Sequence, residues 1–499
     1  MQQGTINNLK YSTHYPNILA SCDEKGYISI IDTNAPIIKT SSTNNSQNNN
    51  TNISKLIDPI YYEQCHDNSI FGIDWSDSDN RLLTASADQK GKIINFTSNS
   101  YGTTQLELIG HSKRLKCISQ NVFNDNIICT SGGDSIIFIW DIRNPNKRYC
   151  NKYCPYYKTN SSIDHIHPVG AFRNVYKNYL FKKKYLPSEG GILNLEMPNT
   201  FTGSDFFSDD LVVSIETNND EIKFWDMRNM LNTELDYIFT ETKITKRHLC
   251  KFEQKNYLAA ISPYTYLYTN YAMVKERHKM SSKYLSSNNM LFGGLNLIMS
   301  NAAMNKGKES NHTIDKYINK IKYFNNFDYE KTKNVEKEML INSSSQANQN
   351  VNENESKDYE EEMYYKTKIN ELKTKRSKKG ITSLNINRKE RKILINSISN
   401  TQYVYDSLYM DIKKPIELKG HESSYYVKSV LSPCGRYVLS GSNKACVHIW
   451  DLHNKENVIE LKGYHTTSVN AVDWNRNDNN FIASGCDSGC IILWSVNNN

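Results

Sequence analysis

Residues 110–141, GHSKRLKCISQNVFNDNIICTSGGDSIIFIWD, decide the fold because their pattern recurs along the chain. Within this stretch His111 and Trp140 lie 29 positions apart, and two short apolar runs flank a turn of Gly, Asp and Ser. The same His-to-Trp spacing recurs at His421–Trp450 and at His465–Trp494. One further copy, Cys65–Ile94, lacks its Trp. Successive copies start about 44 residues apart, which predicts a four-stranded antiparallel sheet for each copy, the blade of a β-propeller.

Weaker copies fill the intervals between the strong ones. They carry the same pair of apolar runs around a turn and occupy residues 17–32, 211–228 and 381–406. The total is seven copies, so the predicted fold is all-β, a seven-bladed propeller. The chain stops five residues after Trp494, which leaves no outer strand for the last blade, and only some ten residues precede the first. We therefore expect imperfect closure of the ring or an incomplete N-terminus.

Long insertions account for much of the chain length. With 499 residues, 38% apolar and 23% charged, the sequence is too polar for all of it to be buried. We expect blades 1–4 within residues 1–266, with insertions at 41–55 and 144–199, and blades 5–7 within residues 380–499. Residues 267–379 form the largest insertion, in which an Asn-rich run precedes an acidic run and then a basic run. Such charge blocks are typical of disorder, so we expect this insertion to be largely disordered.

Composition excludes several classes of protein. The polar N-terminus lacks a secretory signal, and the longest apolar stretch, residues 291–304, is too short to cross a bilayer. Eleven cysteines without such a signal indicate reduced thiols, so we expect an intracellular, soluble protein without membrane contact. A net charge of +7 (60 Lys and Arg against 53 Asp and Glu) is too small to predict direct nucleic-acid binding.

Catalytic motifs are missing from the sequence. It contains no GxxxxGK[ST], HExxH or GxSxG pattern, so we expect neither an enzyme nor a cofactor. A zinc site is the one metal hypothesis, from Cys150, Cys154, His165 and His167, but their spacing fits no common zinc motif and an ordinary loop is the favoured interpretation.

Two Trp-Asp-x-Arg boxes are the clearest candidates for function. They occupy residues 140–143 and 225–228, at the ends of strands in consecutive blades. Two arginines side by side, Arg143 and Arg228, would form a paired basic contact able to bind carboxylates or carbonyls in a fork-like geometry. The alternative is that each arginine is merely solvated.

The repeats resemble the WD40 family. In that family a blade is held by a buried chain of His in the first loop, Ser or Thr on the second strand, Asp in the hairpin and Trp on the third strand. In the third blade the matching residues are His111, Thr130, Asp134 and Trp140; His421, Trp450, His465 and Trp494 mark the sixth and seventh. Three positions depart from the pattern: Ile94 replaces the Trp of the second blade, Asn219 the Asp of the fourth and Lys444 the Asp of the sixth.

Within WD40 proteins the sequence resembles the denticleless family. The resemblance is carried by residues 420–433 (GHESSYYVKSVLSP) and 437–442 (YVLSGS), by 70–75 (IFGIDW) and 83–89 (LTASADQ), and by the two Trp-Asp-x-Arg boxes. It implies a non-catalytic substrate receptor of a nuclear cullin-4 RING ubiquitin ligase, which docks on the adaptor damaged-DNA-binding protein 1 and presents replication-licensing or cell-cycle proteins for degradation. A cytoplasmic pool is a further expectation.

The resemblance also implies roles for individual residues. One rim of the propeller would hold the adaptor through Trp140, Asp141 and Arg143 and through Trp225, Asp226 and Arg228. The opposite loops would bind a degron displayed on the DNA sliding clamp, and because such degrons carry a basic residue the candidates there are Asp67, Glu422 and Tyr425. The basic residues 373–379 would serve nuclear import, or merely balance the acidic run before them.

Two rival functions stay open. The first is a generic WD40 scaffold of another nuclear complex, for chromatin or RNA processing, in which the arginine pair is incidental. The second is an enzyme with a propeller body, which would require a metal or a nucleophile.

Overall fold

A computed structural model of the chain describes two units. The described residues are 4–35, 38–39, 55–97, 101–134, 136–143, 164–173, 201–216, 221–232, 257–286, 351–374, 380–454 and 456–495. The first unit comprises residues 1–257, 379–404 and 416–499, and the second comprises residues 258–378 and 405–415.

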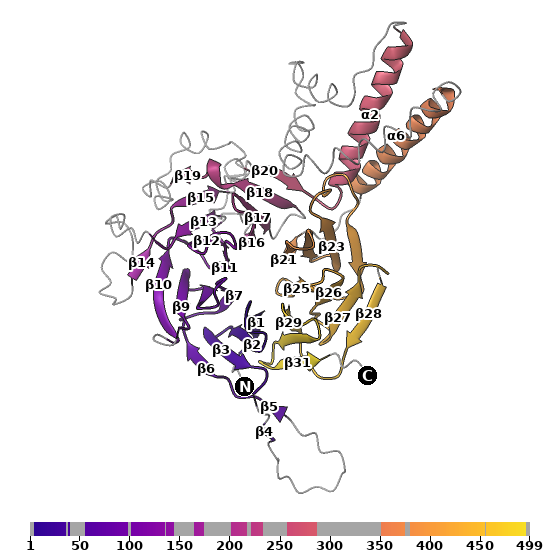
Figure 1. The fold of residues 1–499 in the computed structure, drawn as a ribbon. Coiled ribbons are helices and arrows are strands. Elements are labelled where there is room, and N and C mark those ends of the chain that lie inside the picture. Colours follow the sequence, from indigo (N-terminus) through magenta and orange to yellow (C-terminus); the bar gives the residue numbers. More distant parts are fainter. Residues whose placement is uncertain are drawn as a thin grey trace, which may run out of the picture. The chain divides into compact units, whose positions relative to one another are not determined.

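The blades are seven sheets that follow one another along the described residues. In each sheet the first strand lies nearest the centre of the ring in Figure 1, and the next strands pair outward, antiparallel except for β14 (Asp164–Ile166), which pairs in parallel with β10 (Thr103–Ile109) at the edge of blade 2. In blades 1 to 3 the orders are β1-β2-β3-β6 (Ile6–Tyr11, Ile18–Asp23, Tyr27–Asp32, Tyr61–Gln64), β7-β8-β9-β10 (Ile70–Trp75, Arg81–Ser86, Lys90–Asn95, Thr103–Ile109), and β11-β12-β13-β15-β19 (Leu115–Gln120, Ile127–Gly132, Ile136–Asp141, Gly170–Arg173, Leu231–Asn232).

Blades 4 to 7 repeat this meander. Their orders are β16-β17-β18-β20 (Phe201–Ser208, Leu211–Glu216, Ile222–Asp226, Tyr257–Ile261), β21-β22-β23-β24 (Ile381–Asn387, Lys392–Ser397, Thr401–Asp406, Ile416–Lys419), β25-β26-β27-β28 (Ser429–Leu431, Tyr437–Ser440, Val447–Asp451, Glu456–Leu461) and β29-β30-β31 (Val469–Trp474, Phe481–Cys486, Ile491–Ser495). The fold predicted from the repeats is thereby confirmed as a seven-bladed β-propeller.

Apolar side chains on both faces of the sheets form the core. Between blades 2 and 3, for example, Leu83 and Ile93 pack in one cluster with Ile118, Phe138 and Trp140, all at most 3% exposed. Burying each such side chain contributes about 1.5–3 kcal/mol, so contacts between neighbouring blades supply much of the stability. This explains why the strands are rich in Ile, Leu and Val and why the turns between them are polar.

The ring closes by packing of blade 1 against blade 7. The short segment before residue 17, which the repeat pattern left unassigned, contains β1, the first strand of blade 1. Its Ile6, Leu9 and Tyr11 pack against Ala471 and Ala483 of blade 7. The backbone N–H of Tyr11 also donates to Asp473 Oδ2 at 2.7 Å. In the described residues the seventh sheet has three strands, so side-chain packing and not an exchanged strand joins the two blades there.

The insertion predicted at 144–199 is not entirely outside the blades. Its described part contains β14 (Asp164–Ile166), which pairs in parallel with β10, and β15, which is the fourth strand of blade 3. The sequence analysis was wrong to assign this whole stretch to an insertion. The outer strand escaped notice because it spans only four residues, from Gly170 to Arg173, and carries no Trp-Asp marker. The insertion predicted at 41–55 lies almost entirely outside the described residues, except for the end of the β4–β5 hairpin (Ile38–Lys39, Lys55–Leu56).

The second unit contains two helices that pack on each other, α2 (Thr265–Ser286) and α6 (Val351–Thr374). Helix α6 includes the acidic run and part of the basic run, so the expected disorder is wrong for residues 351–374; residues 287–350 and 375–379 of this predicted insertion lie outside the described residues. Its acidic residues lie toward the N-terminus and its basic residues toward the C-terminus, an order that the helix dipole favours. An ion pair one turn apart, between Lys368 Nζ and Glu371 Oε2 at 3.0 Å, adds to this. Neither helix is long and apolar enough to span a membrane, and the same holds for every other helix in the described residues.

Candidate functional site

A closed hydrogen-bond chain holds blade 3 together. The His111 ring binds Asp134 Oδ2 through Nδ1 at 2.8 Å and Thr130 Oγ1 through Nε2 at 2.8 Å, and Trp140 Nε1 donates to the same Thr130 oxygen at 2.8 Å. Burial alone would raise the pKa of Asp134, but His111 and the backbone N–H of Ser112 lower it below its usual value. The structure thus brings together the four residues that the sequence analysis selected in this blade.

The other blades contain partial versions of this chain. In blade 2, His66 binds Asp88 and Thr84 at 2.7 and 2.8 Å, although Ile94 occupies the Trp position. In blade 7, His465 Nε2 and Trp494 Nε1 both lie 2.7 Å from the Ser484 hydroxyl. Asn219 of blade 4 lies outside the described residues.

Blade 6 is connected differently. His421 Nε2 lies 2.8 Å from Asn396 Oδ1 of blade 5, and His421 Nδ1 has no hydrogen-bond partner in the described part of the chain. Trp450 Nε1 donates to the Lys419 carbonyl at 3.1 Å. Lys444, at the expected Asp position, pairs with Glu422 at 3.0 Å on the surface. The blade is therefore tied to its neighbour by its histidine.

The two Trp-Asp-x-Arg boxes adopt the same geometry. Arg143 donates from Nε to Asp141 Oδ1 at 3.0 Å and from Nη2 to Asp141 Oδ2 at 2.7 Å. Arg228 makes the same two bonds to Asp226 at 2.9 and 2.8 Å. The side chains of Arg143 and Arg228 are 60% and 53% exposed. We call each such arginine, held on an aspartate by two nitrogens, a fork.

The tryptophans of the two Trp-Asp-x-Arg boxes are buried. Trp140 and Trp225 are 0% and 1% exposed, and Trp225 Nε1 donates to Ser214 Oγ at 2.7 Å. The sequence analysis placed both among the adaptor-binding residues. Because they are buried, they can only position Asp141 and Asp226 and cannot touch a partner.

A third fork was missed. In blade 6, Arg436 Nη2 donates to Asp451 Oδ2 at 2.7 Å, and its Nε lies 3.2 Å from both carboxylate oxygens. The Arg436 side chain is 49% exposed. Here the arginine comes from the turn before β26, because His453 stands where the boxes have Arg. This fork could be predicted only from the strand register, in which Tyr437, the residue after Arg436, lies opposite Asp451. No local sequence motif contains both residues of the fork.

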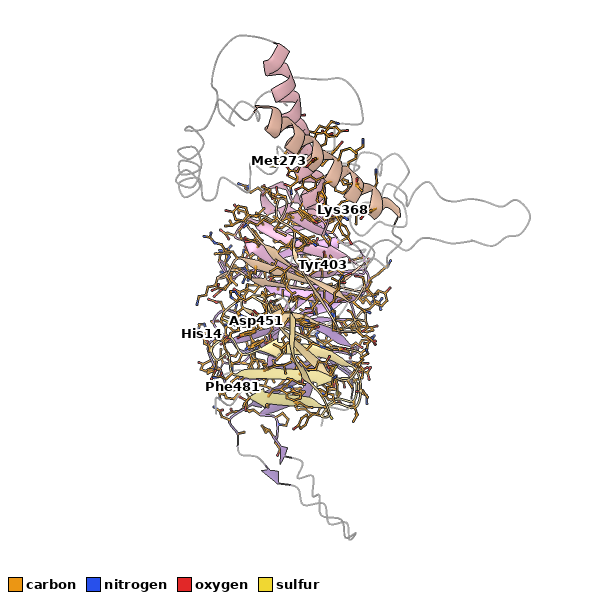
Figure 2. All side chains as sticks on the ribbon, turned by 90° about the vertical axis from the view of Figure 1, so that its right-hand side faces the viewer. His14, Met273, Lys368, Tyr403, Asp451 and Phe481 are labelled. Carbon is orange, nitrogen blue, oxygen red and sulfur yellow. The ribbon has the colours of Figure 1, made fainter. Side chains whose placement is uncertain are left out.

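The forks and the degron candidates lie on opposite rims of the propeller. Forks occur where third strands end; Asp67, Glu422 and Tyr425 occur in the loops that lead from one blade to the next. Figure 2, a view onto the edge of the sheets, shows Asp451 of the third fork toward the same edge as His14 and Phe481.

The three degron candidates lie in the loops that lead into blades 2 and 6. Glu422 is engaged by Lys444, Asp67 is exposed, and Tyr425 is 57% exposed. A cavity of about 500 Å³ lies beside them, lined by residues of blades 1, 2, 6 and 7 that include Glu24, Phe71, Tyr426 and Asp487. These are the residues that sequence reasoning missed, since they come together only through the closure of the ring.

The zinc hypothesis finds no support in the described residues. Cys150 and Cys154 lie outside them, and His165 Nδ1 lies 3.4 Å from Glu107 Oε2. No group of three His, Cys, Asp or Glu side chains in the described part of the chain could hold a metal.

Comparisons with known proteins agree with this geometry. The family described as WD domain, G-beta repeat, matches residues 58–95, 102–141, 413–451 and 455–495, about a third of the chain. The sheets, the His–Ser/Thr–Trp bonds and these matches define a WD40-repeat β-propeller.

Several relatives carry the denticleless name. The Denticleless protein homolog of Gallus gallus is 28% identical over 160 residues, covering 31% of this chain and 18% of that protein. Protein lethal(2)denticleless of Drosophila melanogaster is 32% identical over 120 residues, covering 24% and 16%. Protein Atg16l2 of Mus musculus is 33% identical over 116 residues, covering 23% and 18%. The chain is thus a WD40-repeat protein that resembles the denticleless family, and it matches less than a fifth of the length of these three relatives.

Proposed function

We propose that the chain is a non-catalytic substrate receptor of a cullin-4 RING ubiquitin ligase, and that Arg143 and Arg228 dock it on a damaged-DNA-binding protein 1-type adaptor. The observation that carries the proposal is the pair of matching forks in consecutive blades. The coarser conclusion, a WD40 propeller that serves protein–protein interaction, rests on the repeats and on the relatives.

The forks suit a docking role for a physical reason. Each aspartate fixes the guanidinium plane before any partner arrives, so little side-chain entropy is lost on binding. In Arg143 the bonds to aspartate engage Nε and Nη2, and the Nη1 hydrogens and the second Nη2 hydrogen can donate to carbonyl or carboxylate oxygens of the adaptor.

The substrate would bind at the opposite rim. There Asp67, Glu422 and Tyr425, together with the cavity lined by Glu24 and Asp487, offer carboxylates and aromatic rings to a degron with a basic residue. In this proposal the substrates are replication-licensing or cell-cycle proteins, some of them held on the sliding clamp, and the receptor acts in the nucleus.

A generic scaffold is the second candidate. Protein Atg16l2 matches this chain with an identity similar to that of the denticleless proteins. A scaffold would hold its partners without requiring Arg143 and Arg228.

Affinity purification of the full chain beside an Arg143→Glu/Arg228→Glu variant tests the proposal. The matched control is Lys113→Glu/Arg114→Glu, which reverses two exposed charges on the opposite rim. We expect the adaptor and a cullin to copurify with the intact chain and with the control, and to be lost from the fork variant. A partner set that lacks both proteins and does not respond to the fork variant would favour the scaffold.

A further inference from the structure

On the rim that carries the forks, the turns between the first and second strands differ in charge from blade to blade. It is formed largely by the turns between the first and second strands of each blade. In blades 2 to 4 these turns contain five aspartates and neither lysine nor arginine: Asp77, Asp79, Asp125, Asp209 and Asp210. In blades 5 and 6 they contain four basic residues and one glutamate: Arg388, Lys389, Arg391, Arg436 and Glu390.

The turns of blades 5 and 6 form one continuous surface. Asn387 Nδ2 donates to the Ser432 carbonyl at 3.0 Å and to the Pro433 carbonyl at 3.2 Å. Lys392 Nζ donates to the Gly435 carbonyl at 2.6 Å. These bonds fix the two turns against each other, so their basic side chains belong to one surface.

Each basic residue on this surface has a distinct position. Arg388 is partly buried and pairs with Asp205 of blade 4 at 3.0 Å, so its role is to join blades. Lys389 and Arg391 are exposed. Arg436 is held in the third fork, where Asp451 fixes the guanidinium plane while half of the side chain faces solvent.

We propose that the turns of blades 5 and 6 bind an acidic peptide segment of a partner protein, with Arg436 as the anchor. Asp451 engages Nε and one hydrogen of Nη2, and the Nη1 and second Nη2 hydrogens then bind a carboxylate of the peptide as a second fork. Lys389 and Arg391 contribute charge attraction to neighbouring carboxylates. This surface is separate from Arg143 and Arg228, so the proposal does not depend on adaptor docking.

Charge pattern favours a peptide over nucleic acid. Glu390 and Asp451 lie among the basic residues, and both would repel a continuous phosphate backbone. A peptide can place its carboxylates at Arg436 and Lys389 and its hydrogen-bond donors at Glu390. Nucleic acid is therefore the alternative that the experiment must exclude.

The test measures binding of a short fluorescein-labelled peptide of alternating Asp and Ser to the full chain by fluorescence anisotropy. The surface variant is Lys389→Glu/Arg391→Asn; asparagine is chosen because Arg391 has a φ of 53°, which asparagine tolerates. The matched control, Lys113→Glu/Arg114→Asn, makes the same change in charge on the opposite rim. A conservative variant, Arg436→Lys, keeps the charge at the anchor but removes the planar fork.

We expect the surface variant to weaken peptide binding about tenfold or more, because the substitutions replace two positive charges near the peptide carboxylates by one negative charge, with the control within about twofold of the intact chain. Arg436→Lys should weaken binding about threefold to tenfold, since a point charge cannot replace a bidentate contact. Thermal melting of each variant checks that the propeller is folded. Equal losses in the surface variant and the control, an unchanged affinity of Arg436→Lys, or tighter binding of a DNA duplex than of the peptide would each overturn the proposal.

Discussion

Blade 3 and blade 6 share the same His-to-Trp spacing but are stabilised in different ways. In blade 3 the histidine, threonine and tryptophan form one chain with Asp134 inside the blade. In blade 6 the corresponding histidine turns to Asn396 of blade 5, and the tryptophan binds a backbone carbonyl. The difference teaches that the shared His-to-Trp spacing determines where a blade lies but not what its histidine binds.

Blades 3 and 6 therefore differ in whether their histidine binds within the blade or across the boundary to the next blade. In blade 3 the hydrogen-bond chain from Asp134 through His111 and Thr130 to Trp140 lies within the blade. In blade 6, Lys444 leaves the hairpin for a surface pair, and the histidine binds across the boundary between two blades. Stability in this half of the ring therefore depends on the contact between neighbours.

The largest difference should appear when each hairpin residue is removed. Asp134→Ala should lower the free energy of unfolding by about 3–5 kcal/mol, because it leaves His111 buried without its charged partner. Both side chains of this pair are 1% exposed. Lys444→Ala should cost less than about 1 kcal/mol, because its pair with Glu422 is exposed. Urea-induced unfolding of both variants measures the comparison, and equal losses would contradict it.

The second largest difference between the two blades should be in how their contribution to stability changes at acidic pH. Burial, with the nearby His448 as a smaller cause, lowers the pKa of His421 from its usual 6.5 to about 4. The unfolded chain then binds more protons than the folded chain between pH 6.5 and pH 4, so stability falls as the pH falls through that range. The loss at pH 4 should be about 3 kcal/mol. In blade 3, where the pKa of Asp134 is lowered, the stability that this carboxylate contributes is lost only below its usual pKa of 3.8.

Melting temperatures of the full chain between pH 7 and pH 4 provide the measurement. The control is His421→Gln, whose side chain keeps an amide near Asn396 but does not titrate. This variant should show a shallower pH dependence than the intact chain. If both chains lose stability in parallel, the acid sensitivity resides elsewhere.

The sequence predicted the number and order of blades because the relevant signal is local. Spacing from His111 to Trp140 and the turn between the two apolar runs lie within one blade. The partner of His421 could not be predicted in this way, since Asn396 belongs to another blade and is specified only by the packing of β22 beside the loop before β25. The same limit applies to β1, which is recognisable only once its contact with blade 7 is known.

The forks of the candidate site also differ in whether a local sequence motif contains both residues of the fork. Arg143 and Arg228 were found because each lies two residues after its aspartate, so the motif contains the whole fork. Arg436 was missed because it lies 15 residues before Asp451 and reaches it through strand register. At the forks, sequence thus predicts the contacts that lie within a strand and its turn and misses the one that a second strand completes.

Restoring the hairpin aspartate should sharpen the comparison. Lys444→Asp places a carboxylate at the position that Asp134 has in blade 3, within the loop that faces His421 Nδ1. The new bond should stabilise the chain by about 1 kcal/mol at pH 7 and raise the pKa of His421, because a nearby negative charge favours the protonated ring. Thermal melting at pH 7 and pH 5 should show a higher melting temperature and a smaller loss on acidification. A lower melting temperature at pH 7 would mean that the new carboxylate does not bind His421 Nδ1.

The smallest difference is expected at the forks themselves. Arg143→Gln in blade 3 and Arg436→Gln in blade 6 should each change the free energy of unfolding by less than about 1 kcal/mol, since exposed ion pairs contribute little. Each aspartate also keeps a backbone partner, the N–H of residue 143 at 3.0 Å from Asp141 Oδ1 and the N–H of His453 at 2.9 Å from Asp451 Oδ1. Urea unfolding of both variants measures this, and a loss of several kcal/mol in either would mean that the fork holds its blade together. Near-neutral results would instead leave binding as the property these arginines serve in both blades, because a pre-oriented cation that does not stabilise the fold has its effect on a partner.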